Sequence, residues 1–158
     1  MTLSTALLQL GTAALGSWCF SMIFNVRGRQ LCYTTLGGLL SWAIFLALMP
    51  LGWGTVPRFF ISSVGITIYA EIFARRRKTP ATVFLVPAAV PLIPGAGLYN
   101  TMLCAVHMDG DGFIRQGLNT LLLAGAIAAG IILVSTVMHA ADAYRRKNSP
   151  ANGAKGKK

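Results

Sequence analysis

Five long apolar segments constrain the fold of this chain more than any other feature. They cover residues 3–24, 31–51, 56–74, 81–106 and 116–138. A helix needs about 20 mostly apolar residues to cross ~30 Å of hydrocarbon, and each segment meets that length. Because lipid offers backbone groups no hydrogen-bond partner, such segments are expected to be helices. The sequence therefore predicts an all-α integral membrane protein, with a five-helix transmembrane domain over residues 1–147.

Composition agrees with a membrane location. Hydrophobic residues make up 54% of the 158, charged residues 11%, and the mean hydropathy is +0.61, whereas soluble domains are roughly 25% charged. The net charge of +10 could suggest nucleic acid, but the basic residues lie in short clusters beside apolar segments, without interleaved aromatics. Nucleic-acid binding is therefore not predicted. Residues 148–158 read as a disordered, basic cytoplasmic tail.

The distribution of Lys and Arg predicts the orientation. Two basic residues lie in the turn at 25–29, four at 75–78 and six in 145–158, and only Arg58 and Arg115 remain. Since basic residues favour the cytoplasmic side, the amino terminus is expected outside and the carboxyl terminus in the cytoplasm. Five crossings satisfy this arrangement, whereas a re-entrant fourth segment would put the last cluster on the wrong side. The predicted location is the inner, cytoplasmic membrane of the cell.

The fourth segment is expected to be broken. Pro87, Pro91 and Pro94 fall within eight residues, and Gly95 follows directly. Each proline removes a backbone donor and clashes with the preceding turn, so a continuous helix is not expected. Non-helical backbone at membrane depth persists only where protein buries it or where it lines a wet cavity. The Pro-x-x-Pro-Gly motif therefore predicts two half-helices with an exposed corner between them.

This corner is the predicted substrate site. A helix that restarts after Gly95 has unpaired amides and a positive dipole end, which favour a carboxylate. Three polar side chains follow the break directly, which strengthens this interpretation. The alternative is a kinked packing helix whose gaps are filled by its neighbours. The predicted substrate-binding residues are Pro91, Pro94, Gly95, Ala96, Gly97, Tyr99, Asn100 and Thr101.

Glu71 is the only acidic residue within a predicted span. Two interpretations fit it: half of an i,i+4 ion pair with Arg75, or a carboxylate that couples transport to a proton or cation. Both interpretations stay open. The chain has no metal-ligand spacing, no phosphate loop and no Ser/His/Asp grouping. Neither a metal, a cofactor nor an enzyme activity is therefore predicted, and a proton or charge gradient is the expected driving force.

The sequence resembles a known protein family. Residues 71–76, 80–87 and 91–95, with Tyr99 four residues further on, closely resemble the threonine/serine exporter family. The most specific part is the pattern Pro-x-x-Pro-Gly-x-x-x-Tyr. The resemblance runs over about residues 10–146. In length and topology the chain is similar to the small membrane subunit of the split, two-chain form, which corresponds to the second half of the fused exporter.

The resemblance implies export of small carboxylate-bearing metabolites, either threonine and serine or a dicarboxylate such as succinate. It also implies a larger homologous membrane subunit as partner, with the solute crossing between the two halves. Membrane lipid and the small-molecule solute are the other expected partners. The rival interpretation is a non-transporting accessory subunit, which stabilises or regulates a larger partner.

Overall fold

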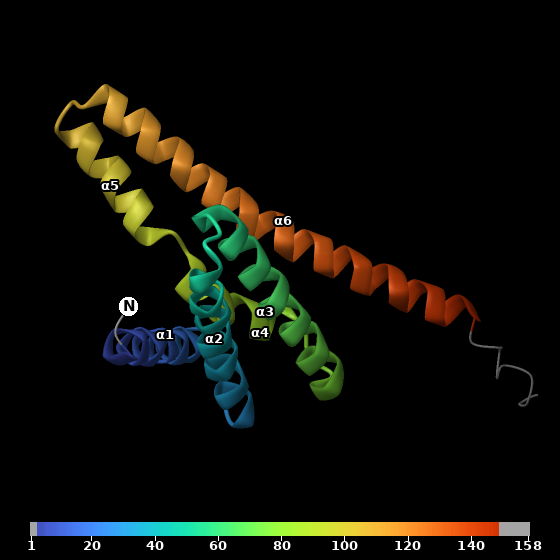
Figure 1. Cartoon of the computed structure of the whole chain (residues 1–158). Helices are drawn as coiled ribbons and strands as arrows, with labels where there is room; N and C mark the ends of the chain where they lie inside the picture. Colours follow the sequence, from blue (N-terminus) through green and yellow to red (C-terminus); the bar gives the residue numbers. More distant parts are fainter. Residues whose placement is uncertain (1–2, 149–158) are drawn as a thin grey trace, which may run out of the picture.

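The computed structural model describes residues 3–148, and all regular structure within them is helical (Figure 1). The predicted all-α class is confirmed. In chain order the elements are α1 (Leu3–Ile23), α2 (Arg29–Ala47), η1 (Met49–Leu51), α3 (Thr55–Arg77), α4 (Thr82–Ala89), η2 (Val90–Leu92), α5 (Gly95–Val106) and α6 (Gly110–Asn148). The two η elements are short 3-10 helices.

Several of these helices suit a bilayer. Within the described residues, four helices are long and apolar enough to cross a membrane, and the bent pair of α4–η2 with α5 makes a fifth if it counts as one span. Large apolar side chains are exposed along them, among them Leu8, Leu121 and Ile132. Exposed apolar surface on this scale requires lipid or a partner. The chain is therefore a multi-pass membrane protein.

The helix ends differ from the predicted spans mainly at the last segment. The prediction covered residues 116–138, whereas α6 begins at Gly110 and continues to Asn148. Hydropathy marks only the part of a helix that prefers lipid. Past residue 138 the sequence is rich in alanine and arginine, which favour helix without being apolar as a group. Asn148, the first residue of the predicted tail, ends α6, and residues 149–158 lie outside the described residues.

Helices α1 and α2 pack antiparallel through small side chains. Ser21 Oγ donates a hydrogen bond to Thr34 Oγ1 at 2.7 Å. One helical turn from this hydrogen bond, Gly38 faces Ser17, and a Cβ on Gly38 would lie only 1.8 Å from the Ser17 Oγ. The absence of a side chain at Gly38 thus lets the two backbones approach closely. The glycines at 37 and 38 therefore form a helix contact.

The main apolar core joins four elements around the break in the fourth segment. Phe45 of α2 and Phe59 of α3 have ring centroids 4.8 Å apart. Ile66 of α3, Leu92 of η2 and Leu123 of α6 complete the buried cluster. Leu92 is fully buried, and η2 packs against α1, α2 and α3. The irregular stretch therefore has a packed side as well as an open one.

Helices α3 and α6 run side by side in the same direction. Near the middle, Gly130 of α6 lies against Ser63, where a Cβ would come within 2.9 Å of the Phe60 carbonyl oxygen. Near the carboxyl end of α3, Arg75 donates a hydrogen bond to Asp142 of α6. The two contacts follow in the same order along both helices, as parallel packing requires. The end of α3 that carries Arg75–Arg77 therefore lies beside the second half of α6.

The fourth segment is broken, as its prolines predict. Its two helices, α4 and α5, are bent by 54° across η2 and Pro94. In Figure 1, α5 leaves the body formed by α1 to α4 and runs back along the first half of α6. Helix α5 packs mainly against α6. Most of its remaining surface therefore meets no other helix of this chain.

Candidate functional site

The break itself is short and defined by two prolines. Pro91 lies inside η2, Ile93 is extended (φ −61°, ψ 123°), and Pro94 adopts φ −76° and ψ 59° before α5 begins. Because neither proline has an N–H, neither can continue the helical ladder. The only backbone bond across the corner is a tight one, from the Gly95 amide to the Ile93 carbonyl at 2.7 Å. The polypeptide therefore leaves the helical conformation for only a few residues.

The amino end of α5 is uncapped. No side chain bonds to its first-turn amides, and the first amides of a helix have no acceptor within the helix. The Leu98 amide bonds to the Pro94 carbonyl, which leaves the amides of Ala96 and Gly97 for an outside acceptor. The positive end of the helix dipole points the same way. Since Gly95 and Ala96 are exposed, an anion has access to this end.

The predicted site residues on α5 divide between two faces. Gly97 and Thr101 face α6: a Cβ on Gly97 would lie 2.5 Å from Thr120 Oγ1, and the Thr101 methyl lies near Gly117. The Thr101 hydroxyl donates to the Gly97 carbonyl at 2.8 Å. Thr101 is therefore occupied in helix packing, and the three polar side chains behind the break do not converge on one cavity.

Tyr99 and Asn100 point away from that packed face. Tyr99 is 67% exposed and Asn100 is also exposed, so within this chain neither lines an enclosed cavity. Asn119 is exposed on α6, whereas Thr120 is buried against Gly97 and donates to the Gln116 carbonyl one turn earlier. The exposed polar groups of the break thus lie on the surface of α5 that no other helix of the chain covers.

A hollow of about 280 Å³ lies on the other side of the break. Pro91 and Val90 of η2 form one wall, and Gln9, Thr12 and Trp42 give it polar groups from α1 and α2. Trp42 Nε1 donates to Gln9 Oε1 at 3.4 Å. The sequence analysis missed these side chains. Gln9 was the available signal, because it is an amide side chain inside an apolar segment.

Glu71 is 7% exposed and its carboxylate accepts no hydrogen bond from the described residues. Its nearest cation is the Arg75 Nε, 3.8 Å from Oε2. That guanidinium is engaged elsewhere: Nη1 donates to Asp142 at 2.7 Å and Nη2 to the Met138 carbonyl at 3.2 Å. The i,i+4 pair that the sequence suggested is present but loose. Glu71 therefore remains a buried carboxylate with little compensation.

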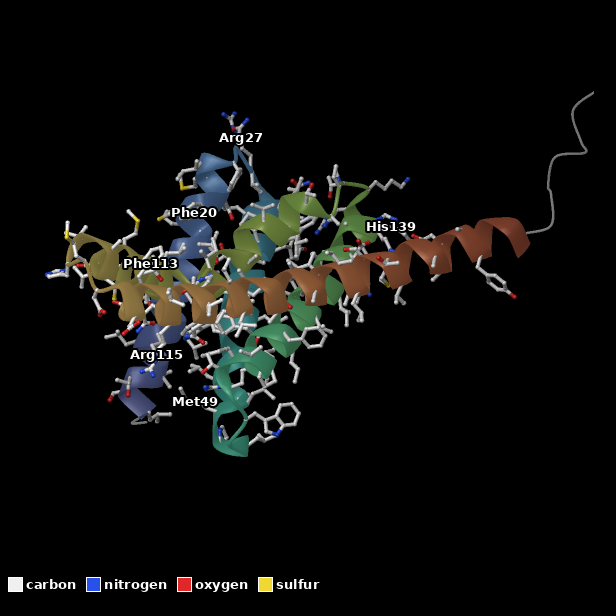
Figure 2. The ribbon with its side chains drawn as sticks, turned by 90° about the horizontal axis from the view of Figure 1, so that it is seen from above. Phe20, Arg27, Met49, Phe113, Arg115 and His139 are labelled. Carbon is white, nitrogen blue, oxygen red and sulfur yellow. The ribbon has the colours of Figure 1, made fainter. Side chains whose placement is uncertain are left out.

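Glu71 faces a cavity of about 430 Å³ where the end of α3, the start of α4 and the second half of α6 meet. Figure 2 shows His139 on α6, on the side where α3 ends and α4 begins. Helix α4, about 12 Å long at 1.5 Å per residue, separates this cavity from the break. The sequence analysis missed its other polar lining residues, because they come from two segments that are separate from α3: Thr79, Thr82, Ser135, His139 and Asp142.

Comparison with known proteins adds one family and no structural neighbour. The family described as threonine/serine exporter, ThrE, matches residues 9–137, which run from α1 to the second half of α6 and include the break and Glu71. No solved structure matches the chain. The family is one of transporters. With its apolar helices and its broken fourth segment, the chain belongs to the threonine/serine exporter family.

Proposed function

We propose that this chain is the small subunit of a two-chain exporter, which moves carboxylate-bearing metabolites out across the inner membrane together with a larger homologous subunit. The observation that carries the proposal is the uncovered surface of α5. Asn100, Tyr99 and the free amides of the first turn lie there, in a segment whose other exposed residues are apolar. Polar groups at membrane depth are costly in contact with lipid. A partner subunit that encloses them with water and solute removes that cost.

The proposed topology has five crossings, with the amino terminus outside and the carboxyl terminus in the cytoplasm. The contact of Arg75 with Asp142 supports an even number of crossings between α3 and the end of α6, because both residues then lie on one side. If the fourth segment were re-entrant, α6 would carry Asp142 to the opposite side. The basic residues at 75–78 and 145–147 then share the cytoplasmic side.

In this arrangement the solute carboxylate binds at the amino end of α5. Pro91, Pro94 and Gly95 hold the corner open, and the amides of Ala96 and Gly97 donate to the carboxylate. Tyr99 and Asn100 orient the solute from the side that the partner covers. A carboxylate is common to threonine, serine and succinate, so this site does not discriminate among the three.

Glu71 is the proposed coupling group. It is a buried carboxylate near the proposed cytoplasmic end, and its nearest cation among the described residues, Arg75, is paired with Asp142. Acidic side chains inside a membrane span are costly and mark proton or ion pathways. Glu71 would then link export to a proton or cation gradient.

Efflux measurements test the proposal. Cells that express the larger subunit, with or without this chain, are preloaded with labelled L-threonine, L-serine or succinate. We expect efflux only when both chains are present, and we expect Asn100→Ala to lower it severalfold. Met102→Ala is the matched control, because Met102 is also exposed on α5 but apolar. Equal efflux with and without this chain would refute the proposal.

The same assay separates an accessory role. An accessory subunit predicts that Asn100→Ala leaves efflux unchanged, while omission of the chain lowers the amount of the larger subunit in the membrane. Immunodetection of the larger subunit in each strain distinguishes the two results.

A further inference from the structure

The cavity at Glu71 has a lining that points to a particular kind of solute. Its volume of about 430 Å³ falls within the roughly 300–1,000 Å³ of small-molecule sites. Three segments that are far apart in the sequence supply the polar groups: the end of α3, residues 79–82, and one face of α6. On α6 the contributors are Ser135, His139 and Asp142, spaced so that they fall on one side of the helix.

The charged groups of the lining favour a cation. Glu71 and Asp142 are opposed by a single guanidinium, that of Arg75, so with neutral His139 the described lining has a formal charge of −1. Arg75 lies 2.7 Å from Asp142 but 3.8 Å from Glu71. Asp142 is thus satisfied, whereas the Glu71 carboxylate lacks a hydrogen-bond donor. A buried carboxylate without a donor is costly, and an ammonium group supplies both the charge and the N–H groups.

The uncharged polar groups add a hydroxyl preference. Thr79 Oγ1 is buried and has no hydrogen-bond partner. Thr82 and Ser135 contribute two further hydroxyls, which bond to none of the described residues. Hydroxyls both donate and accept, so they can pair with a solute hydroxyl and with a carboxylate oxygen. A second carboxylate on the solute, by contrast, would be repelled by Glu71.

We propose that this cavity is a loading site for hydroxyl-bearing amino acids, in which Glu71 binds the solute ammonium group and excludes dicarboxylates. This inference rests on the proposed function, because the proposed topology places the cavity at the cytoplasmic end of the bundle. From there α4 leads to the corner at Pro94, where the solute carboxylate is received. The solute ammonium group then binds to the same carboxylate that is proposed to couple transport.

Protection of an introduced cysteine tests the site. Ser135→Cys is placed in a chain whose Cys19, Cys32 and Cys104 are replaced by alanine, co-expressed with the larger subunit, and labelled in inverted membrane vesicles with a hydrophilic thiol reagent. A compound at about ten times its Kd should slow labelling about tenfold, because only the free cavity reacts. We expect L-serine and ethanolamine to protect, and 3-hydroxypropionate and succinate not to protect. Ethanolamine and 3-hydroxypropionate share a hydroxyl and differ in the charged group.

Two further variants assign the effect to Glu71. With Ser135→Cys, Glu71→Gln should abolish protection by ethanolamine, and Glu71→Asp should retain part of it, which shows that the cavity is still folded. Thr136→Cys, exposed at the next position of α6, should label at the same rate with and without ligand. Protection by succinate equal to that by ethanolamine, no protection by any compound, or protection that survives Glu71→Gln would overturn the inference.

The efflux assay with the unaltered chain keeps the two proposals separate. Efflux that depends on both chains, combined with no protection at Ser135→Cys, would refute the loading site and leave the exporter proposal standing. Absence of efflux would refute the exporter proposal, whereas protection would still identify an amine-binding cavity.

Discussion

Arg75 on α3 donates a hydrogen bond of 2.7 Å to Asp142 on α6, across 67 residues of sequence. The same guanidinium lies 3.8 Å from Glu71, one helical turn away on α3. Asp142 therefore does two things at once. It fixes the second half of α6 beside the end of α3, and it holds the guanidinium away from the buried carboxylate that faces the cavity.

Asp142→Asn should weaken ligand binding in the cavity more than it destabilises the fold. The ion pair is partly exposed, and such pairs contribute at most about 1 kcal/mol, so the free energy of unfolding in detergent should fall only slightly. Released from Asp142, Arg75 becomes free to neutralise Glu71, and protection of Ser135→Cys by ethanolamine should drop severalfold. Asp111→Asn, in the first turn of α6, is the control. Unchanged protection in Asp142→Asn would contradict this account of Arg75.

Gly38→Ala should destabilise the α1–α2 pair. The new Cβ would overlap the Ser17 hydroxyl at 1.8 Å, and overpacking of this kind costs about 1–3 kcal/mol. Thermal unfolding in detergent should show the loss. Gly11→Ala is matched to it, because Gly11 also lies in this helix pair and has nothing within 4 Å of its Cβ position. Equal melting of the two variants would show that the helices are not in contact at Gly38.

A disulfide should form between positions 97 and 120. A Cβ on residue 97 would lie 3.3 Å from the Thr120 Cβ, close to the roughly 3.5–4.5 Å found in disulfides. In the cysteine-free chain, Gly97→Cys with Thr120→Cys should cross-link on oxidation, as detected by the fragment pattern after cleavage at an inserted protease site in the α5–α6 turn. Tyr99→Cys with Thr120→Cys should not, because Tyr99 lies on the other face of α5. The reverse result would mean that α5 packs on α6 through another face.

The helices and the break were predictable because their causes are local. Lipid offers the backbone no hydrogen-bond partner, so long apolar segments form helices. The prolines at 91 and 94 prevent a straight helix regardless of what surrounds them. The faces of α5 were not predictable in the same way. Gly97 and Thr101 were grouped with Asn100 by sequence distance, but the close approach of Thr120 to Gly97 decides that they pack inward.

The cavity at Glu71 shows a second limit. From sequence, Glu71 had one visible partner, Arg75, four residues on. Three residues that change its environment lie more than 60 positions away: Ser135, His139 and Asp142. They belong to α6, whose predicted span ended at residue 138. Only the parallel packing of α3 and α6 brings them together. Long-range packing of this kind is invisible to spacing rules that act within one helix.

The central claim is that the surface of α5 at the break faces water and solute inside a two-subunit transporter. Reactivity of Asn100→Cys with a membrane-impermeant thiol reagent tests it most directly, in the cysteine-free chain co-expressed with the larger subunit. We predict fast labelling that L-serine slows, and negligible labelling of Leu121→Cys, an exposed apolar position on α6. If Asn100→Cys is as unreactive as Leu121→Cys, that surface faces lipid and the account is wrong.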